Sequence, residues 1–283
     1  MADRTPTMTE RLRHLRHVVL DLDGTIYNGG TLFATTRPFL ALLDRLGIGH
    51  TFITNNPSKS VGDYLQHLHR LGIPAQPEQL YTSTQATITY LDQVQPRPRR
   101  LFVLGTESMS REIEAAGFGL CADSADDEPD AVVVAFDKTL TYSRLCRAAW
   151  WIKNGKPFIA TNPDRVCPTD EPTVLVDCGS ICAALQTATG RAPDAVMGKP
   201  DPAMLRGVLL RQSLRPDELA MVGDRLYTDM AMARRTGVLG VLVLTGETTA
   251  AAAAKHTPPP DLVVSDLAEL GEKLNAARAA TTQ

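Results

Sequence analysis

A short apolar run that ends in two aspartates, Val18-Val19-Leu20-Asp21-Leu22-Asp23-Gly24-Thr25, constrains this chain more than any other feature. In an extended strand, residues i and i+2 share a face, so Asp21 and Asp23 can point the same way where the strand ends. Two converging carboxylates bind a hard cation well, and one of them can act as a nucleophile. Because open α/β sheets bind ligands beyond the carboxyl ends of their strands, the segment predicts a site there.

Three later segments repeat the pattern of a short strand followed by small polar or charged residues. Thr54 and Asn55 offer hydrogen-bond donors suited to phosphate oxygens. Lys199, between a glycine and a proline, can supply a point charge to a phosphate. Asp224 follows another apolar run and would be a further oxygen ligand for the cation, with Asp229 five residues later. Each segment alone fits a turn, a helix cap or an exposed lysine, but their order favours one shared site.

Strands and helices alternate along the chain, which favours a parallel sheet. One set of strands is expected at 17–22, 50–54, 80–81, 219–222, 238–244 and 262–264. Between them, a second set is expected at 101–104, 131–136, 158–160 and 173–176, and residues 250–260 are interpreted as a low-complexity connector. We therefore predict an α/β fold: a doubly wound, Rossmann-like parallel-sheet core in residues 1–81 and 195–283, with a smaller α/β domain inserted at 82–194.

Composition narrows the class of protein. A length of 283 residues is typical of about two domains, and a net charge of −3 argues against a nucleic-acid partner. The sequence contains no run of 18 apolar residues, so no membrane span or membrane partner is expected. Residues 1–17 lack the apolar stretch of a signal peptide, and five cysteines without a Cys-x-x-Cys pair fit a reducing compartment. We expect a cytoplasmic protein.

The segments around Asp21, Thr54, Lys199 and Asp224 resemble the motifs of the haloacid dehalogenase superfamily. The resemblance extends over residues 16–270. The matching motifs are, in order, Asp21 to Thr25, Thr54-Asn55, Lys199, and Gly223-Asp224 with Asp229. The insert resembles a type-2 cap. Phrases such as Thr245-Gly246-Glu247 are similar to the subfamily IIA phosphatases, the branch of NagD-like and para-nitrophenyl-phosphate phosphatases.

The resemblance implies a Mg²⁺-dependent phosphatase for small phosphomonoesters. It assigns Asp21 as the nucleophile that forms an aspartyl-phosphate. Asp23 would protonate the leaving alcohol and then activate water for the second step. The Mg²⁺ ligands would be the carboxylates of Asp21 and Asp224 and the main-chain carbonyl of Asp23. Asp229 would lie outside them and orient the ligands or Lys199.

The resemblance also implies a set of phosphate-binding residues. Lys199 would pair with both Asp21 and the phosphate, beside the donors Thr54 and Asn55. The loop next to the metal would be lined by Arg225, Leu226, Tyr227 and Thr228. Two alternatives stay open from the sequence: Asp229 as the N-cap of the following helix, and Arg225 as one half of a surface ion pair.

The inserted domain is expected to choose the substrate. Subfamily relatives often have Pro-Gly where this chain has Asp177-Cys178, so we expect Asp177 to accept hydrogen bonds from substrate hydroxyls or an amine. The alternative is an N-cap for the helix that starts near Ile181. Asn162 and Asp164 are further candidates for the same role. Sugar, cyclitol and nucleotide monophosphates are the expected substrates, and a homodimer through the cap is expected from the family.

Two other functions fit the same motifs. A phosphotransferase or phosphomutase would pass the phosphoryl group to another alcohol instead of water. A non-catalytic module would bind a phosphorylated metabolite and would have lost a motif residue, yet the motif residues are all present. Dehalogenase chemistry does not fit, because Asp23 and Asp224 are both present.

Overall fold

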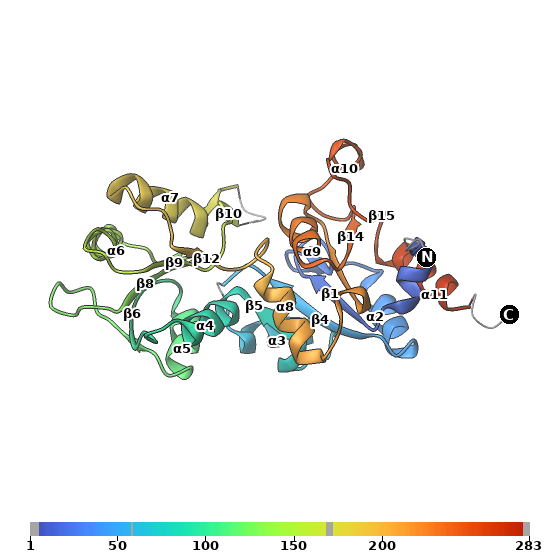
Figure 1. Cartoon of the computed structure of the whole chain (residues 1–283), viewed down its shortest axis with the longest axis horizontal. Helices are drawn as coiled ribbons and strands as arrows, with labels where there is room; N and C mark the ends of the chain where they lie inside the picture. Colours follow the sequence, from blue (N-terminus) through green and yellow to red (C-terminus); the bar gives the residue numbers. More distant parts are fainter. Residues whose placement is uncertain (1–5, 58, 168–171, 280–283) are drawn as a thin grey trace, which may run out of the picture. The chain divides into compact units, whose positions relative to one another are not determined.

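The computed structural model describes residues 6–57, 59–167 and 172–279, which form two compact units (Figure 1). The first unit contains the described parts of 1–53, 70–80 and 204–283. The second contains the described parts of 54–69 and 81–203. Among the described residues, every helix is too short or too polar to cross a membrane.

A six-stranded sheet, in the order β15-β14-β13-β1-β4-β5, organises the first unit (Figure 1). The neighbouring pairs from β15 through to β4 are parallel. Strands β1, β13 and β14 are buried along their whole length, as expected where helices cover both faces of a parallel sheet. The strands are β1 (His17–Asp21), β4 (Gly49–Thr54), β5 (Leu80–Thr82), β13 (Leu219–Gly223), β14 (Leu239–Val243) and β15 (Leu262–Val264).

Helices and one hairpin complete this unit. They are α1 (Met8–His14), α2 (Thr36–Arg45), α8 (Ala203–Gln212), α9 (Ala231–Thr236), α10 (Ala250–Lys255), α11 (Leu267–Ala279) and the hairpin of β2 (Tyr27–Asn28) with β3 (Thr31–Leu32). Helix α10 corrects the prediction of a connector over 250–260. The side chain of Thr249 accepts a hydrogen bond from the main-chain N–H of Ala252 and caps a run of alanines, the residue with the highest helix propensity.

A five-stranded sheet, in the order β12-β9-β8-β6-β7, forms the centre of the second unit, and its neighbouring pairs are all parallel. Its strands are β6 (Arg100–Leu104), β7 (Gly119–Leu120), β8 (Ala131–Val134), β9 (Phe158–Ala160) and β12 (Ala195–Val196). The helices are α3 (Val61–Arg70), α4 (Ser83–Gln93), α5 (Glu107–Ala115), α6 (Tyr142–Lys153) and α7 (Cys178–Thr189). Side chains of α6 and α7, among them Trp151 and Leu185, pack with β8 and β9 into one core.

The second unit extends beyond the helices and central strands, and one predicted strand lies outside its sheet. Ala195 and Val196 pair with Ile159 and Ala160 of β9, so this sheet continues beyond residue 194. Segments 54–69 and 195–203 also fall in the second unit. The predicted strand at 173–176 is shorter and lies outside the sheet, because β11 (Leu175–Val176) pairs antiparallel with β10 (Val166–Cys167).

Candidate active site

Three buried carboxylates meet at the carboxyl ends of adjacent strands in the first unit. Leu20 of β1 pairs with Val222 of β13, so Asp21 and Asp224 leave the sheet at the same edge. Ligand oxygens of Asp21, Asp224 and Asp229 all lie within 4.8 Å of one another, and all three residues are buried. A compact set of carboxylate oxygens is the donor set that a hard divalent cation such as Mg²⁺ prefers, so these residues fit a metal.

Close backbone approaches hold Asp224 in this cluster. A Cβ added to Gly24 would lie 2.5 Å from Asp224 Oδ2, and one added to Gly246 would lie 2.1 Å from the same atom. Gly24 also has a φ of +83°, which side chains with a Cβ rarely adopt. The main-chain N–H of Glu247 donates a hydrogen bond to Asp224 Oδ2 at 2.6 Å, and Thr245 Oγ1 donates to the Gly24 carbonyl at 2.6 Å.

Asp23 is half-buried and lies just beyond β1, where its backbone forms an isolated bridge with Tyr27. Asp23 is expected to contact the metal through its main-chain carbonyl, whereas the cluster described above consists of side-chain oxygens. The expected contact of Asp23 therefore stays a prediction. The expected roles of Asp21 as nucleophile and Asp23 as acid and base stay predictions.

The loop after Asp224 is a π-helical turn over Leu226–Met230, a conformation that is common at functional sites. Asp229 Oδ2 accepts a hydrogen bond from the main-chain N–H of Arg225 at 3.1 Å. The N-cap of the following helix α9 is Met230, so Asp229 does not occupy the capping position considered from the sequence. Thr228 is buried and Tyr227 is 56% exposed.

The contacts of Arg225 and Leu226 show what these two side chains do in the loop. Arg225 Nε pairs with Glu247 Oε2 at 2.9 Å, and the arginine side chain is only 17% exposed. The alternative of an ion pair is therefore observed, between a largely buried Arg225 side chain and a Glu247 side chain that is 48% exposed. Leu226 packs against a small apolar cluster with Met230 and Leu242, so its side chain serves packing. Phosphate binding by this loop stays a prediction.

A second group of predicted residues comes together in the second unit. Asn55 Oδ1 accepts a hydrogen bond from the main-chain N–H of Lys199 at 2.6 Å, and Asn55 Nδ2 donates to the Lys199 carbonyl at 2.9 Å. Asn162 Nδ2 donates to the Asn55 carbonyl at 3.1 Å, and Asn55 Nδ2 also lies 3.2 Å from Asp164 Oδ2. Thr54 Oγ1 accepts from the Asn56 N–H at 3.1 Å. Asn55 therefore links two motifs that are 144 residues apart in the sequence.

Asp177 occupies the N-cap position of α7, where its side chain accepts from the Cys178 N–H at 2.5 Å. This is the structural alternative considered from the sequence. Asp177 is buried, and a contact with substrate stays a prediction.

Glu247 is the residue of this site that the sequence analysis did not single out. Its main-chain N–H contacts Asp224. Its carboxylate forms the ion pair with Arg225 and accepts a hydrogen bond from the Tyr227 hydroxyl at 3.1 Å. The sequence signal that could have identified Glu247 is the segment Thr245-Gly246-Glu247. Above, this segment served only as evidence that the chain resembles subfamily IIA.

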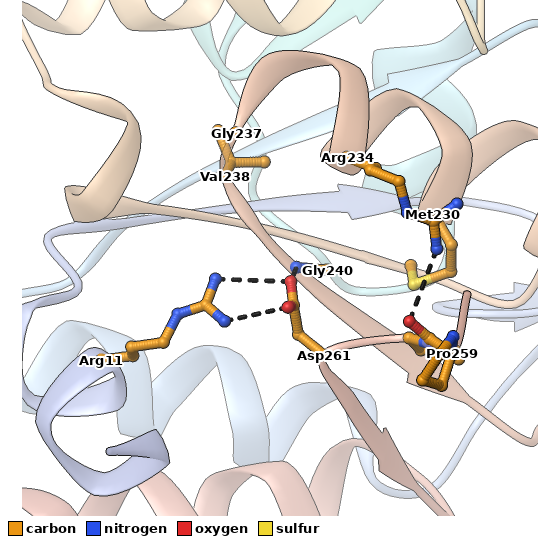
Figure 2. A pocket seen from close by; sticks show the side chains of 9 residues that line it. Arg11, Met230, Arg234, Gly237, Val238, Gly240, Pro259 and Asp261 are labelled. Atoms are coloured by element: carbon orange, nitrogen blue, oxygen red, sulfur yellow. Dashed lines mark hydrogen bonds and ion pairs between the residues drawn. The ribbon is translucent and has the colours of Figure 1, made fainter. Parts of the chain in front are cut away.

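A separate pocket of about 190 Å³ lies in the first unit. Figure 2 shows the side chains that line it. The Arg11 guanidinium pairs there with both carboxylate oxygens of Asp261, at 2.9 and 3.3 Å, and Arg234 donates to the Pro258 carbonyl at 2.8 Å. Gly240 and Asp261 lie at the amino ends of β14 and β15. Because the strands are parallel, this is the edge of the sheet opposite the acidic cluster, and the pocket is not part of the candidate active site.

Two family profiles match the chain: one described as haloacid dehalogenase-like hydrolase over residues 18–119, and one described as HAD-hydrolase-like over residues 196–270. The chain belongs to the haloacid dehalogenase-like hydrolases, in the NagD-like subfamily IIA. The predicted superfamily, the predicted fold class and the prediction of an enzyme of the hydrolase class are confirmed.

Individual relatives span most of the chain. An acid sugar phosphatase of Staphylococcus aureus is 31% identical over 258 residues, which cover 91% of this chain and 97% of the relative. A 4-nitrophenylphosphatase from Thermotoga maritima superposes with a TM-score of 0.87 at 37% identity, covering 93% and 98% of the two chains. A glycerol phosphate phosphatase from Mycobacterium tuberculosis, solved with magnesium, has a TM-score of 0.82 at 33% identity, covering 93% of this chain and 77% of that one.

Proposed function

We propose that this chain is a Mg²⁺-dependent phosphomonoester phosphatase that acts on a small phosphorylated metabolite. The observation that carries the proposal is the gathering of Asp21, Asp224 and Asp229 at the carboxyl ends of β1 and β13 in a chain of this family. The relatives support the same class, because each of the three is a phosphatase by name. Their sugar and glycerol phosphate substrates favour a sugar, polyol or cyclitol phosphate over a nucleotide.

The proposed mechanism uses two aspartates at the carboxyl end of β1: Asp21, the last residue of the strand, and Asp23 just beyond it. The Asp21 carboxylate attacks phosphorus and forms an aspartyl-phosphate, while Asp23 gives its proton to the oxygen of the leaving alcohol. Asp23, now a carboxylate, takes a proton from water as the water attacks the aspartyl-phosphate. This step releases inorganic phosphate and restores the Asp21 carboxylate.

Residues of the first unit would hold the metal ion. The donors would be the carboxylates of Asp21 and Asp224 and the main-chain carbonyl of Asp23, with Asp229 orienting them from outside. Bound Mg²⁺ would neutralise charge on the phosphoryl oxygens, which otherwise repel a carboxylate nucleophile.

Thr54, Asn55 and Lys199 would bind the phosphoryl group, as the family motifs predict. The two hydrogen bonds between the Asn55 amide and the Lys199 main chain support a shared task, because they keep these two residues in a fixed relation. Lys199 would also offset the repulsion between the phosphate and Asp21.

Substrate choice is assigned to the second unit, with Asp177 accepting hydrogen bonds from substrate hydroxyls or an amine. Replacement of Asp177 by alanine is expected to raise KM or change substrate preference with little change in kcat. The same kinetics for both proteins across a substrate panel would contradict this role. Association of two copies through this unit stays a prediction.

The first test is phosphate release from a panel of sugar, cyclitol, polyol, nucleotide and cofactor phosphates with Mg²⁺. Asp21→Asn is expected to abolish turnover and to keep the fold, while Asp92→Asn, an exposed carboxylate paired with Arg97, serves as the matched control. Turnover that survives Asp21→Asn would overturn the assignment of the nucleophile. Transfer of the phosphoryl group to an added alcohol without net hydrolysis would favour the phosphotransferase reading, and binding without any reaction would favour a non-catalytic module.

A further inference from the structure

Arg225 is the cation that this loop places beside the acidic cluster of the first unit. It follows Asp224 directly, and its main-chain N–H binds Asp229 Oδ2 at 3.1 Å. Its side chain is 17% exposed and pairs through Nε with Glu247 Oε2 at 2.9 Å. A largely buried guanidinium next to metal-binding acids calls for an explanation, because its charge repels the cation that these acids are suited to hold.

Glu247 connects the guanidinium to the cluster on the other side. Its main-chain N–H donates to Asp224 Oδ2 at 2.6 Å, and its carboxylate also accepts from the Tyr227 hydroxyl at 3.1 Å. Arg225 is therefore connected to the acids in two ways. Its main-chain N–H binds Asp229 directly, and its guanidinium pairs with Glu247, whose main-chain N–H binds Asp224. These contacts hold the guanidinium on the Glu247 side and restrain it from closing onto the acids.

The electrostatic environment keeps this arginine charged. The Arg225 guanidinium stays protonated, as arginine does in proteins, and Asp21, Asp224 and Glu247 all interact with it electrostatically. The three cluster acids are buried within 4.8 Å of one another, so their mutual repulsion is strong unless a cation lies nearby.

We propose that Arg225 is a positioning residue that acts as a built-in counter-cation of the Asp21–Asp224–Asp229 cluster and thereby sets its affinity for Mg²⁺. The inference rests on the proposed function, because it takes Mg²⁺ as the ion that the cluster holds. Arg225 stabilises the acids while no divalent cation is bound. Once Mg²⁺ binds, the same charge opposes it and keeps the affinity moderate, and Glu247 prevents the guanidinium from occupying the position of the metal.

The test is Mg²⁺ binding measured by isothermal titration calorimetry, together with thermal unfolding in chelator and in saturating Mg²⁺. Arg225→Gln is expected to bind Mg²⁺ about tenfold more tightly than the unaltered protein, because a like charge near the ion has been removed. It is expected to unfold at a lower temperature in chelator, with the difference shrinking as Mg²⁺ saturates the site. Arg225→Lys is expected to keep the original affinity.

Two further variants make the result specific. Glu247→Gln is expected to weaken Mg²⁺ binding, because it removes a negative charge and frees the guanidinium to approach the acids; it carries the test if Arg225→Gln does not fold. Arg215→Gln, at an exposed arginine paired with Asp217, is the matched control and should leave the affinity unchanged.

Several outcomes would overturn the inference. One is a cooperatively folded Arg225→Gln protein whose Mg²⁺ affinity is unchanged or weaker. Another is an Arg225→Lys protein that behaves like Arg225→Gln, which would assign the effect to hydrogen bonding and not to charge. Absence of Mg²⁺ binding by the unaltered protein would overturn the inference and the proposed metal dependence together. The expected affinity pattern in a protein that hydrolyses no phosphomonoester would support the inference and overturn only the proposed function.

Discussion

The side-chain amide of Asn55 forms hydrogen bonds with both the main-chain N–H and the main-chain carbonyl of Lys199, at 2.6 and 2.9 Å. An amide side chain can bind a peptide unit in this way because it carries one acceptor and one donor. Both residues are buried, so loss of either partner would leave a main-chain group unsatisfied away from water.

Replacement of Asn55 by aspartate is therefore expected to destabilise the protein by about 2–4 kcal/mol, because a carboxylate would face the Lys199 carbonyl in place of a donor. Urea unfolding followed by circular dichroism measures the change. Asn154→Asp is the matched control, since the exposed Asn154 amide also donates to a main-chain carbonyl, that of Trp150. An equal loss of stability in Asn55→Asp and Asn154→Asp would contradict the stabilising role of the Asn55 hydrogen bonds.

Replacement of Gly246 by alanine is expected to displace Asp224. The added Cβ would lie 2.1 Å from Asp224 Oδ2 and 2.6 Å from its Cγ, which is shorter than any tolerated contact. We expect Mg²⁺ affinity to fall by about tenfold or more and stability to fall by about 1–3 kcal/mol. Calorimetric Mg²⁺ titration measures the first effect, with Gly30→Ala as control because a Cβ there meets nothing within 4 Å. Normal Mg²⁺ binding by Gly246→Ala would contradict the geometry of this site.

His17 is expected to make the fold sensitive to mild acid. Burial, with a smaller contribution from His50, lowers the pKa of His17 from 6.5 to about 4. Between these values the unfolded chain binds a proton that the folded chain does not, so His17 lowers stability as pH falls from 6.5 to 4, by at most about 3 kcal/mol. His17→Gln keeps a partner for the Thr51 hydroxyl, which lies 2.8 Å from His17 Nε2, and removes this contribution.

The measurement is the free energy of unfolding of His17→Gln and of the unaltered protein at several pH values from 4 to 8. The difference between the two should change across the window from 4 to 6.5 and stay constant above pH 7. A difference that stays constant from pH 4 to 8 would contradict this role of His17.

Glu112 on α5 is expected to have the opposite pH dependence. Burial raises the pKa of Glu112 to about 7, against the effect of a hydrogen bond from the Val61 main chain, and the charge of Asp63 raises it further. The folded chain therefore keeps a proton that the unfolded chain loses near pH 4.5, and stability falls as pH rises from 4.5 to 7. Glu112→Gln should be about 1–2 kcal/mol more stable than the unaltered protein at pH 8, after allowance for partial exposure, and similar to it at pH 4. Glu114→Gln, an exposed change on the same helix, should show no gain at either pH.

The sequence predicted the parts of this molecule that depend on local pattern. Buried strands such as β1 and β13 are short apolar runs, and the acids that follow them identified the edge of the sheet where Asp21 and Asp224 meet. Helix α10 was missed because residues 250–260 were interpreted as a low-complexity connector, whereas alanine has the highest helix propensity and Thr249 caps the run.

The features that the sequence did not predict depend on main-chain contacts between distant segments. Strand β12 has only two residues, and its place beside β9 is decided by pairing with residues more than 30 positions earlier. The contact of Glu247 with Asp224 is made by a main-chain N–H, which any residue except proline could supply, so the identity of the side chain gives no signal. The link between Asn55 and Lys199 is hidden in the same way.

The glycines around the acids have a consequence for how this site tolerates change. A Cβ at Gly24 or Gly246 would collide with the Asp224 carboxylate, and one at Gly223 would lie 2.3 Å from that of Asp229. In a saturation mutagenesis scan, substitutions at these three glycines should therefore be tolerated as poorly as substitutions of the neighbouring acids. This is expected although glycine has no side chain to take part in chemistry. For protein design, grafting the aspartates onto another parallel sheet would not transfer the site, because the empty volume at these backbone positions is as much a part of it as the carboxylates.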